Sequence, residues 1–275
     1  MNNRVLQTGL WVLLSCIGWQ AQAGTVIQQE QRDPGSDQAR FRVTLSVDAG
    51  KLRVEGENPG SGPGSGKFAM IFDQAKQVLW MMDPGKGSYL EMTAAQVQGM
   101  GQQMQQMMQQ MEAQLAQIPP EQRAMVEQMM KQQMGNSAPP QVTVREKSRG
   151  EKVGQFVCTR YEVLTQGQVT EEICAAPAAQ LQLEASALET FKALAAFYEP
   201  LSRQVPKGGW SVSSAMREIQ GFPVRTVVYE GQKPASEWVV VKIETKPLDV
   251  GLFTLPANLK KTEMPQMPQM PMMQR

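Results

Sequence analysis

Nine methionines lie between Met100 and Met134, in a segment otherwise rich in glutamine. Thioether sulfur can ligate soft ions such as Cu(I), and the same unbranched, polarisable side chain fills irregular apolar contacts. Met104, Met108 and Met111 stand about one helical turn apart, which is the spacing that a Cu(I) site would need. Three interpretations follow for the segment: apolar packing, an adaptable lid over an apolar guest, or a soft-metal site.

Apolar residues recur in this segment at intervals of three and four, which predicts an amphipathic helix with glutamines on its opposite face. Pro119 and Pro120 end that helix and suit the start of a second one, which Gly135 closes. We therefore predict a helical hairpin inserted over residues 93–135. Its apolar stripe supplies our candidate ligand-binding residues, which are Met100, Met104, Met107, Met111, Leu115, Met125 and Met129.

Cys158 and Cys174 form an even pair once Cys16 is removed with a leader peptide. Between them run two alternating stretches around a turn at residues 165–167. A three-residue loop there sets the two cysteines directly opposite each other on a hairpin, at a spacing that a disulfide tolerates. We predict a structural disulfide, and the absence of C-x-x-C spacing argues against a redox-active pair.

The chain contains no histidine, which removes Ser-His-Asp and Cys-His nucleophiles, common zinc sites and an ordinary general base near neutrality. Adjacent carboxylates occur at Glu171 and Glu172, but neighbouring strand residues point to opposite faces, and we expect both to be solvated or ion-paired. Residues 64–67 (GSGK) lack the remaining positions of a phosphate-binding loop. We therefore predict a protein that is not an enzyme and holds no metal or cofactor.

Residues 1–23 resemble a cleaved signal peptide: Arg4 precedes a short apolar run, and Ala21-Gln22-Ala23 is an A-x-A cleavage site. The run is too short to span a membrane. Acylation of Cys16 as a lipoprotein is the alternative to simple cleavage. Loss of Arg4 leaves 26 basic and 26 acidic residues, so the mature chain has no net positive charge that would favour binding to nucleic acid. We expect a periplasmic protein.

Alternation of apolar and polar residues predicts many short strands joined by turns, typical of an antiparallel sheet. The predicted strands cover 39–47, 51–55, 67–73, 77–83, 88–92, 222–230 and 237–245, with a short last strand at 252–256. A helix is predicted to begin at a capping box formed by Ser186 and Glu189 and to kink or end at Pro200. Residues 262–275, rich in methionine and proline, are expected to be a disordered tail.

Four stretches together resemble an exported bacterial family known only as domain of unknown function number 4412. They are MIFDQAKQVLWMMDPGKGSYLEM (70–92), GQFVCTRYEV (154–163), GFPVRTVVYEG (221–231) and LDVGLFTLPANLKK (248–261). The resemblance implies an α+β fold like that of the periplasmic lipoprotein carriers. In that fold a curved antiparallel β-sheet forms an open half-barrel, with helices on its concave face.

From the resemblance and the residues together we expect one half-barrel domain over residues 24–261, carrying the helical hairpin insertion. The leading hypothesis is a binding module that shelters a hydrophobic ligand, a lipid or a lipidated protein between sheet and helices. Two alternatives stay open: an envelope protein that binds Cu(I)-type ions through methionine, and a structural or interaction protein in envelope assembly. The sequence alone identifies no ligand, partner or oligomeric state.

Overall fold

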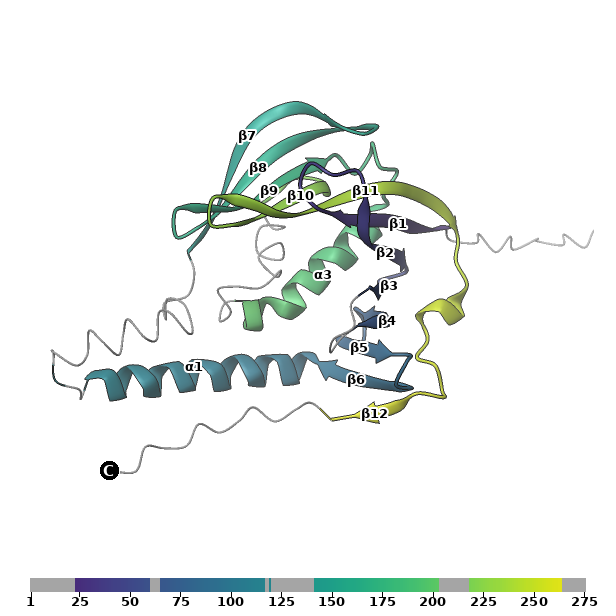
Figure 1. The fold of residues 1–275 in the computed structure, drawn as a ribbon. Coiled ribbons are helices and arrows are strands. Elements are labelled where there is room, and N and C mark those ends of the chain that lie inside the picture. The colour runs from purple at the N-terminus through teal and green to yellow at the C-terminus, as the bar shows by residue number, and fades with distance from the viewer. Residues whose placement is uncertain (1–22, 60–64, 117–118, 120–140, 203–217, 264–275) are drawn as a thin grey trace, which may run out of the picture.

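The computed structural model describes residues 23–59, 65–116, 119, 141–202 and 218–263. Most of these residues form strands (Figure 1). The strands are β1 (Ala23–Arg32), β2 (Ala39–Asp48), β3 (Lys51–Asn58), β4 (Gly66–Asp73), β5 (Val78–Asp83), β6 (Ser88–Thr93), β7 (Val142–Val153), β8 (Phe156–Thr165), β9 (Gln168–Ala176), β10 (Phe222–Glu230), β11 (Lys233–Pro247) and β12 (Lys260–Thr262). The helices described are α1 (Ala94–Ala116), α3 (Ala185–Ser202) and the short 3-10 helix η1 (Val250–Phe253).

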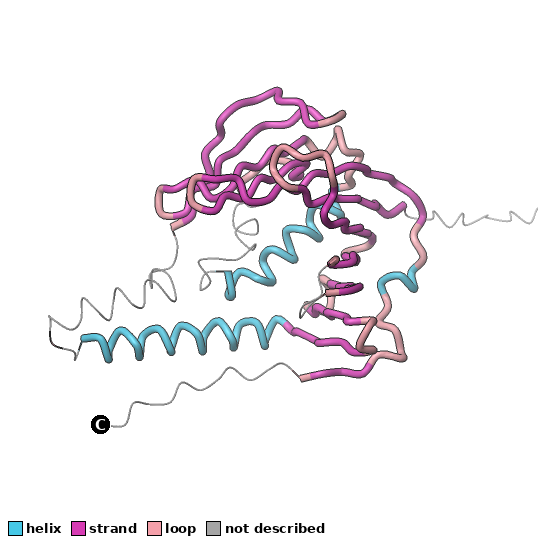
Figure 2. Tube along the Cα trace, viewed as in Figure 1, coloured by secondary structure: helices cyan, strands magenta, loops and turns pink. Residues whose placement is uncertain are grey.

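All twelve strands belong to one open sheet, in the order β12-β6-β5-β4-β3-β2-β1-β11-β10-β9-β8-β7. Neighbours pair antiparallel except β12, which lies parallel to β6. Figure 2 shows the sheet curving around α3, so that one face is concave. We call this the inner face and define it by Val47, Leu52 and Phe72, which pack against α3. The predicted curved antiparallel sheet with helices is confirmed at this level.

The predicted strand at 252–256 is wrong, because the chain turns there instead of extending. Asp249 caps η1 by accepting a hydrogen bond from the Gly251 N–H at 2.7 Å. Leu255 and Leu259 then pack on the outer face of the sheet against Ile71 and Met82. The last strand forms only afterwards, where Lys260–Thr262 pair with Ser88–Leu90 at the edge of the sheet.

The predicted capping box at α3 is also misplaced. Glu184 caps this helix through its backbone carbonyl, which accepts from the N–H groups of Ala187 and Leu188. A true capping box opens α1 instead: Gln96 N–H donates to Thr93 Oγ1 at 3.3 Å, and Thr93 N–H donates to Gln96 Oε1 at 2.8 Å. The Thr-x-x-Gln pattern that marks it is readable in the sequence.

Helix α1 packs chiefly against α3, not directly on the sheet. Val97 is fully buried there beside Phe197 and Tyr198. The helices approach closely at Gly101, where an added Cβ would lie 2.8 Å from the Pro200 carbonyl oxygen. In the part of the chain that the structure describes, no helix has the length and apolar character needed to cross a membrane.

Candidate functional site

The predicted methionine stripe is only partly placed by the structure. Met100, Met104 and Met107 lie on α1 and are half-buried, with Met100 packed against the core that α1 and α3 share. Met111 and Leu115 fall within α1, but their side chains lie outside what the structure describes. Met125 and Met129 lie outside the described residues altogether. The described part of the stripe therefore begins as an interhelical contact.

One row of inner-face residues is fully covered by the helices. Its members stand directly opposite one another across five strands, and each is at most 8% exposed. This covered row consists of Val47, Leu52, Phe72, Leu79 and Met92. The Phe72 ring meets Phe197 of α3 at 5.5 Å between centroids. The covered row is a packed core, because side chains from both helices fill the space above it.

The next row along the same strands is covered less completely. Leu45, Val54, Met70, Met81 and Leu90 again stand opposite one another, and all five are half-buried. We call this the middle row. Successive inner-face positions on one strand lie two residues, or about 7 Å, apart. Burial therefore falls within a single step away from α3, while the residues remain apolar.

Three aromatic rings lie beyond the middle row and form an aromatic rim of Phe41, Phe68 and Trp238. Phe41 stacks on Phe68 at 5.8 Å and meets Trp238 edge-on at 5.7 Å. All three rings are half-buried. Gly56 lies on the strand between Phe41 and Phe68, and a Cβ there would lie 3.0 Å from the Phe68 ring. The missing side chain at Gly56 lets the two rings meet above β3.

Glu171 is a buried acidic residue on the inner face. Glu171 is 2% exposed, and its Oε2 has no hydrogen-bond partner among the described residues. Its neighbours across the sheet are Val163 and Val228. Burial raises the pKa of the Glu171 carboxyl to about 7. The expectation that this carboxylate is solvated or ion-paired is therefore wrong, because Glu171 is buried and forms no ion pair with a described residue.

Glu172 behaves as the alternation of strand side chains predicts. It points to the outer face and forms an ion pair with Arg160 at 3.7 Å. Other buried acids are also paired: Glu30 with Arg32 and Arg42, and Glu162 with Lys147 and Arg145. Hydrogen bonds from Lys147 and then Arg145 hold the pKa of Glu162 below its ordinary value. The unpaired carboxyl of Glu171 thus contrasts with these paired ones.

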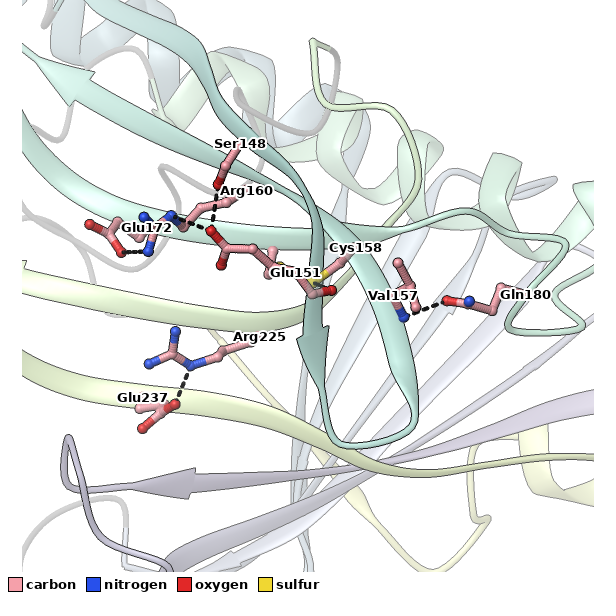
Figure 3. Close-up of a disulfide and its surroundings, with 10 residues drawn as sticks. Ser148, Glu151, Val157, Cys158, Arg160, Glu172, Gln180, Arg225 and Glu237 are labelled. Atoms are coloured by element: carbon pink, nitrogen blue, oxygen red, sulfur yellow. Dashed lines mark hydrogen bonds and ion pairs between the residues drawn. A yellow bond between two sulfur atoms is a disulfide. The ribbon is translucent and has the colours of Figure 1, made fainter.

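The predicted disulfide joins Cys158 and Cys174, with 5.5 Å between their Cα atoms. It belongs to a core cluster with Phe156, Leu181 and Phe222. Figure 3 shows it beside the ion pairs of Arg160 and Arg225. The disulfide has a structural setting, since both cysteines are almost fully buried.

The predicted register of the cysteine hairpin is wrong, because Arg160 and not Cys158 faces Cys174. The turn contains two residues, Gln166 and Gly167, both with positive φ, instead of three. A bulge at Thr170 then adds one residue to β9 and returns the cysteines to a common face. They bond as diagonal neighbours, which is why the pairing is right although the register is not.

A cleft of about 540 Å³ lies where the β7–β8 turn meets β1, β10 and β11. Its charged lining consists of Arg32, Glu151, Lys152, Arg225 and Glu237. Arg225 is bonded to Glu237, Arg32 to Glu30 and Glu151 to Arg160. This cleft is not the apolar space that the sequence predicts between sheet and helices.

No three His, Cys, Asp or Glu side chains come together in the described part of the chain. Met104 and Met108 are half-buried on α1, and the side chain of Met111 is not described. The aromatic rim and Glu171 were not among the predicted site residues. Alternation placed Phe41 and Phe68 on one face of their strands, but their meeting depends on strand order, which no local pattern encodes.

The family model described as a domain of unknown function, DUF4412, matches residues 91–259. This match covers more than half of the chain, so the chain belongs to that family. None of the curated proteins matches the chain. The match spans α1, the cysteine hairpin with Glu171, α3, and the strands β10 and β11 with Trp238.

Proposed function

Since the chain belongs to a family with no assigned activity, we propose from its geometry that it is a non-enzymatic binding module for the apolar chain of a lipid or lipidated partner. The ligand lies along the inner face, over the middle row and the aromatic rim. The main observation behind this proposal is a difference in burial. The covered row is at most 8% exposed, whereas the middle row and the aromatic rim, which are also apolar, remain half-buried.

The composition of this surface suits an alkyl or acyl chain. The middle row offers leucine, valine and methionine, and methionine adapts to guests of varied shape. The aromatic rim adds large flat apolar groups. Apolar area removed from water contributes about 25 cal/mol per Å², so a chain laid over these residues gains binding free energy without any specific polar contact. The periplasmic location expected from the leader peptide is part of the same proposal, because export gives such a module access to lipids.

Tryptophan fluorescence tests the proposal with the protein's own residues. Trp238 belongs to the aromatic rim, whereas Trp80 lies on the outer face and donates to Glu91 at 2.9 Å. Trp210 is the third tryptophan outside the leader. A Trp80→Phe, Trp210→Phe protein reports on Trp238, and a Trp210→Phe, Trp238→Phe protein reports on Trp80.

A brominated long-chain alcohol quenches a tryptophan only at short range. We expect saturable quenching of Trp238 at micromolar alcohol and little quenching of Trp80 in the matched protein. Equal quenching of the two, or none of Trp238, contradicts the proposal. Native mass spectrometry of the purified protein supplies the second measurement, with a co-purifying lipid as the expected result.

A further inference from the structure

Glu171 sits on the same face as the aromatic rim, and its position follows from the strand register. Ile173 stands opposite Thr226, and Thr226 opposite Trp238. Glu171 occupies the next inner-face position on β9 after Ile173. With strands about 4.8 Å apart and about 3.4 Å of rise per residue, the Cα atoms of Glu171 and Trp238 lie roughly 12 Å apart. A medium-length alkyl chain can span that distance.

Four cations of this half of the sheet point away from Glu171. Arg145, Lys147 and Arg160 all bond carboxylates on the outer face, as does Arg225. Val163, Val228 and Ile173 are apolar inner-face neighbours of Glu171, and Thr226 and Tyr161 are polar ones. Farther toward the edge, Glu146 is paired with Arg149. An anionic head group would therefore find a lone carboxyl there and no described counter-charge.

We infer that Glu171 anchors the head group of the bound molecule, and that this head group is a protonated amine on an alkyl chain. The inference rests on the proposed binding of an apolar chain. A buried carboxyl with an unbonded oxygen costs free energy that a cationic N–H donor recovers through a charge-assisted hydrogen bond. The amine meets Glu171, and its chain extends toward the aromatic rim.

A series of twelve-carbon compounds that differ only in the head group tests the inference. Dodecylamine, dodecanol and dodecanoate are each titrated into the full chain at pH 8, where the Glu171 carboxyl is largely ionised, with displacement of a fluorescent apolar probe as the readout. We expect dodecylamine to bind about tenfold or more tighter than dodecanol, as a hydrogen bond to a charged group provides. Dodecanoate is expected to bind most weakly.

Two neutral variants at adjacent positions locate the effect. Glu171→Gln keeps the shape of the side chain and is expected to abolish the preference for the amine while leaving dodecanol affinity unchanged. Glu172→Gln, on the outer face, is the matched control and is expected to retain the preference. Circular dichroism and thermal unfolding establish that both variants are folded.

The outcomes separate the two proposals. If no twelve-carbon compound binds, the proposed function fails and the anchor fails with it. If all three bind with equal affinity, or if Glu171→Gln retains the amine preference, the apolar site stands and the anchor is overturned. A stronger preference for dodecanoate also overturns it.

Discussion

The two ends of the inner face are built from similar residues and differ in what lies over them. At one end the covered row packs against Phe197 and Tyr198 of α3. At the other end the aromatic rim and the middle row remain half-buried, although they are as apolar as the covered row. The covered end accounts for stability, and we assign binding to the other. The alternation of apolar residues along the strands therefore makes the whole inner face apolar, whereas the packing of the helices determines which part of that face becomes a buried core.

The sharpest test of this contrast uses two phenylalanines on one face of β4. Phe72 is fully buried, and Phe68 lies four residues away in the aromatic rim. We expect Phe72→Ala to lower the free energy of unfolding by about 3–5 kcal/mol, because it leaves a cavity under α3. Phe68→Ala is expected to cost less than about 1.5 kcal/mol, since its ring is already partly in water. Urea denaturation measures both, and equal losses would remove the distinction between the two ends.

The disulfide tests whether stability and binding are separable. It closes a separation of 16 residues, so reduction is expected to destabilise the protein by about 3 kcal/mol, mainly through the unfolded chain. Because Cys158 and Cys174 lie in a different core cluster from the covered row, probe affinity below the unfolding transition should not change. A Cys158→Ser, Cys174→Ser variant controls for side effects of the reductant. A loss of affinity that precedes unfolding would contradict the separation.

Glu171 gives stability a pH dependence whose sign is fixed by the direction of its shift. Its pKa in the folded protein is about 7, against 4.5 for an unperturbed glutamate, so the folded state binds this proton more tightly than the unfolded chain does. The cost in folding stability of ionising this buried carboxyl is absent well below pH 4.5 and grows as pH rises to about 7. The free energy of unfolding of Glu171→Gln, taken relative to wild type at the same pH, should therefore rise by about 2–3 kcal/mol between pH 4.5 and pH 8.

Thermal and urea unfolding across that pH range measure the gain. Tyr161, Glu146 and its partner Arg149 are titratable groups that the structure describes on this side of the sheet, and all three are present in the variant as in wild type. Glu172→Gln serves as the control, because Glu172 is ion-paired on the outer face. A gain that is the same at pH 4.5 and pH 8 would assign the effect to packing instead of ionisation.

The sequence predicted most strands correctly, because alternation is a local property and the inner face is continuous. It missed β7, whose apolar residues are interrupted by the charges of an edge strand, including Arg145 and Lys147. The disulfide was predictable from an even number of cysteines, whereas its register was not, because a short turn and the bulge at Thr170 offset each other. Glu171 was missed for a different reason: its burial depends on strands distant in the sequence.

The smallest expected effect tests whether α1 is needed to close the covered end. Gly101 faces α3 with its Cα close to the Pro200 carbonyl, whereas Gly99 on the same helix has open space where a Cβ would lie. Alanine gains about 1 kcal/mol over glycine in a helix, and crowding in a packed contact costs about 1–3 kcal/mol. We therefore expect Gly101→Ala to lower stability by about 1 kcal/mol, and Gly99→Ala to raise it by up to about 1 kcal/mol. Urea denaturation at one pH compares them. If both substitutions stabilise equally, α1 does not close the covered end, and the helix that separates core from binding surface is α3 alone.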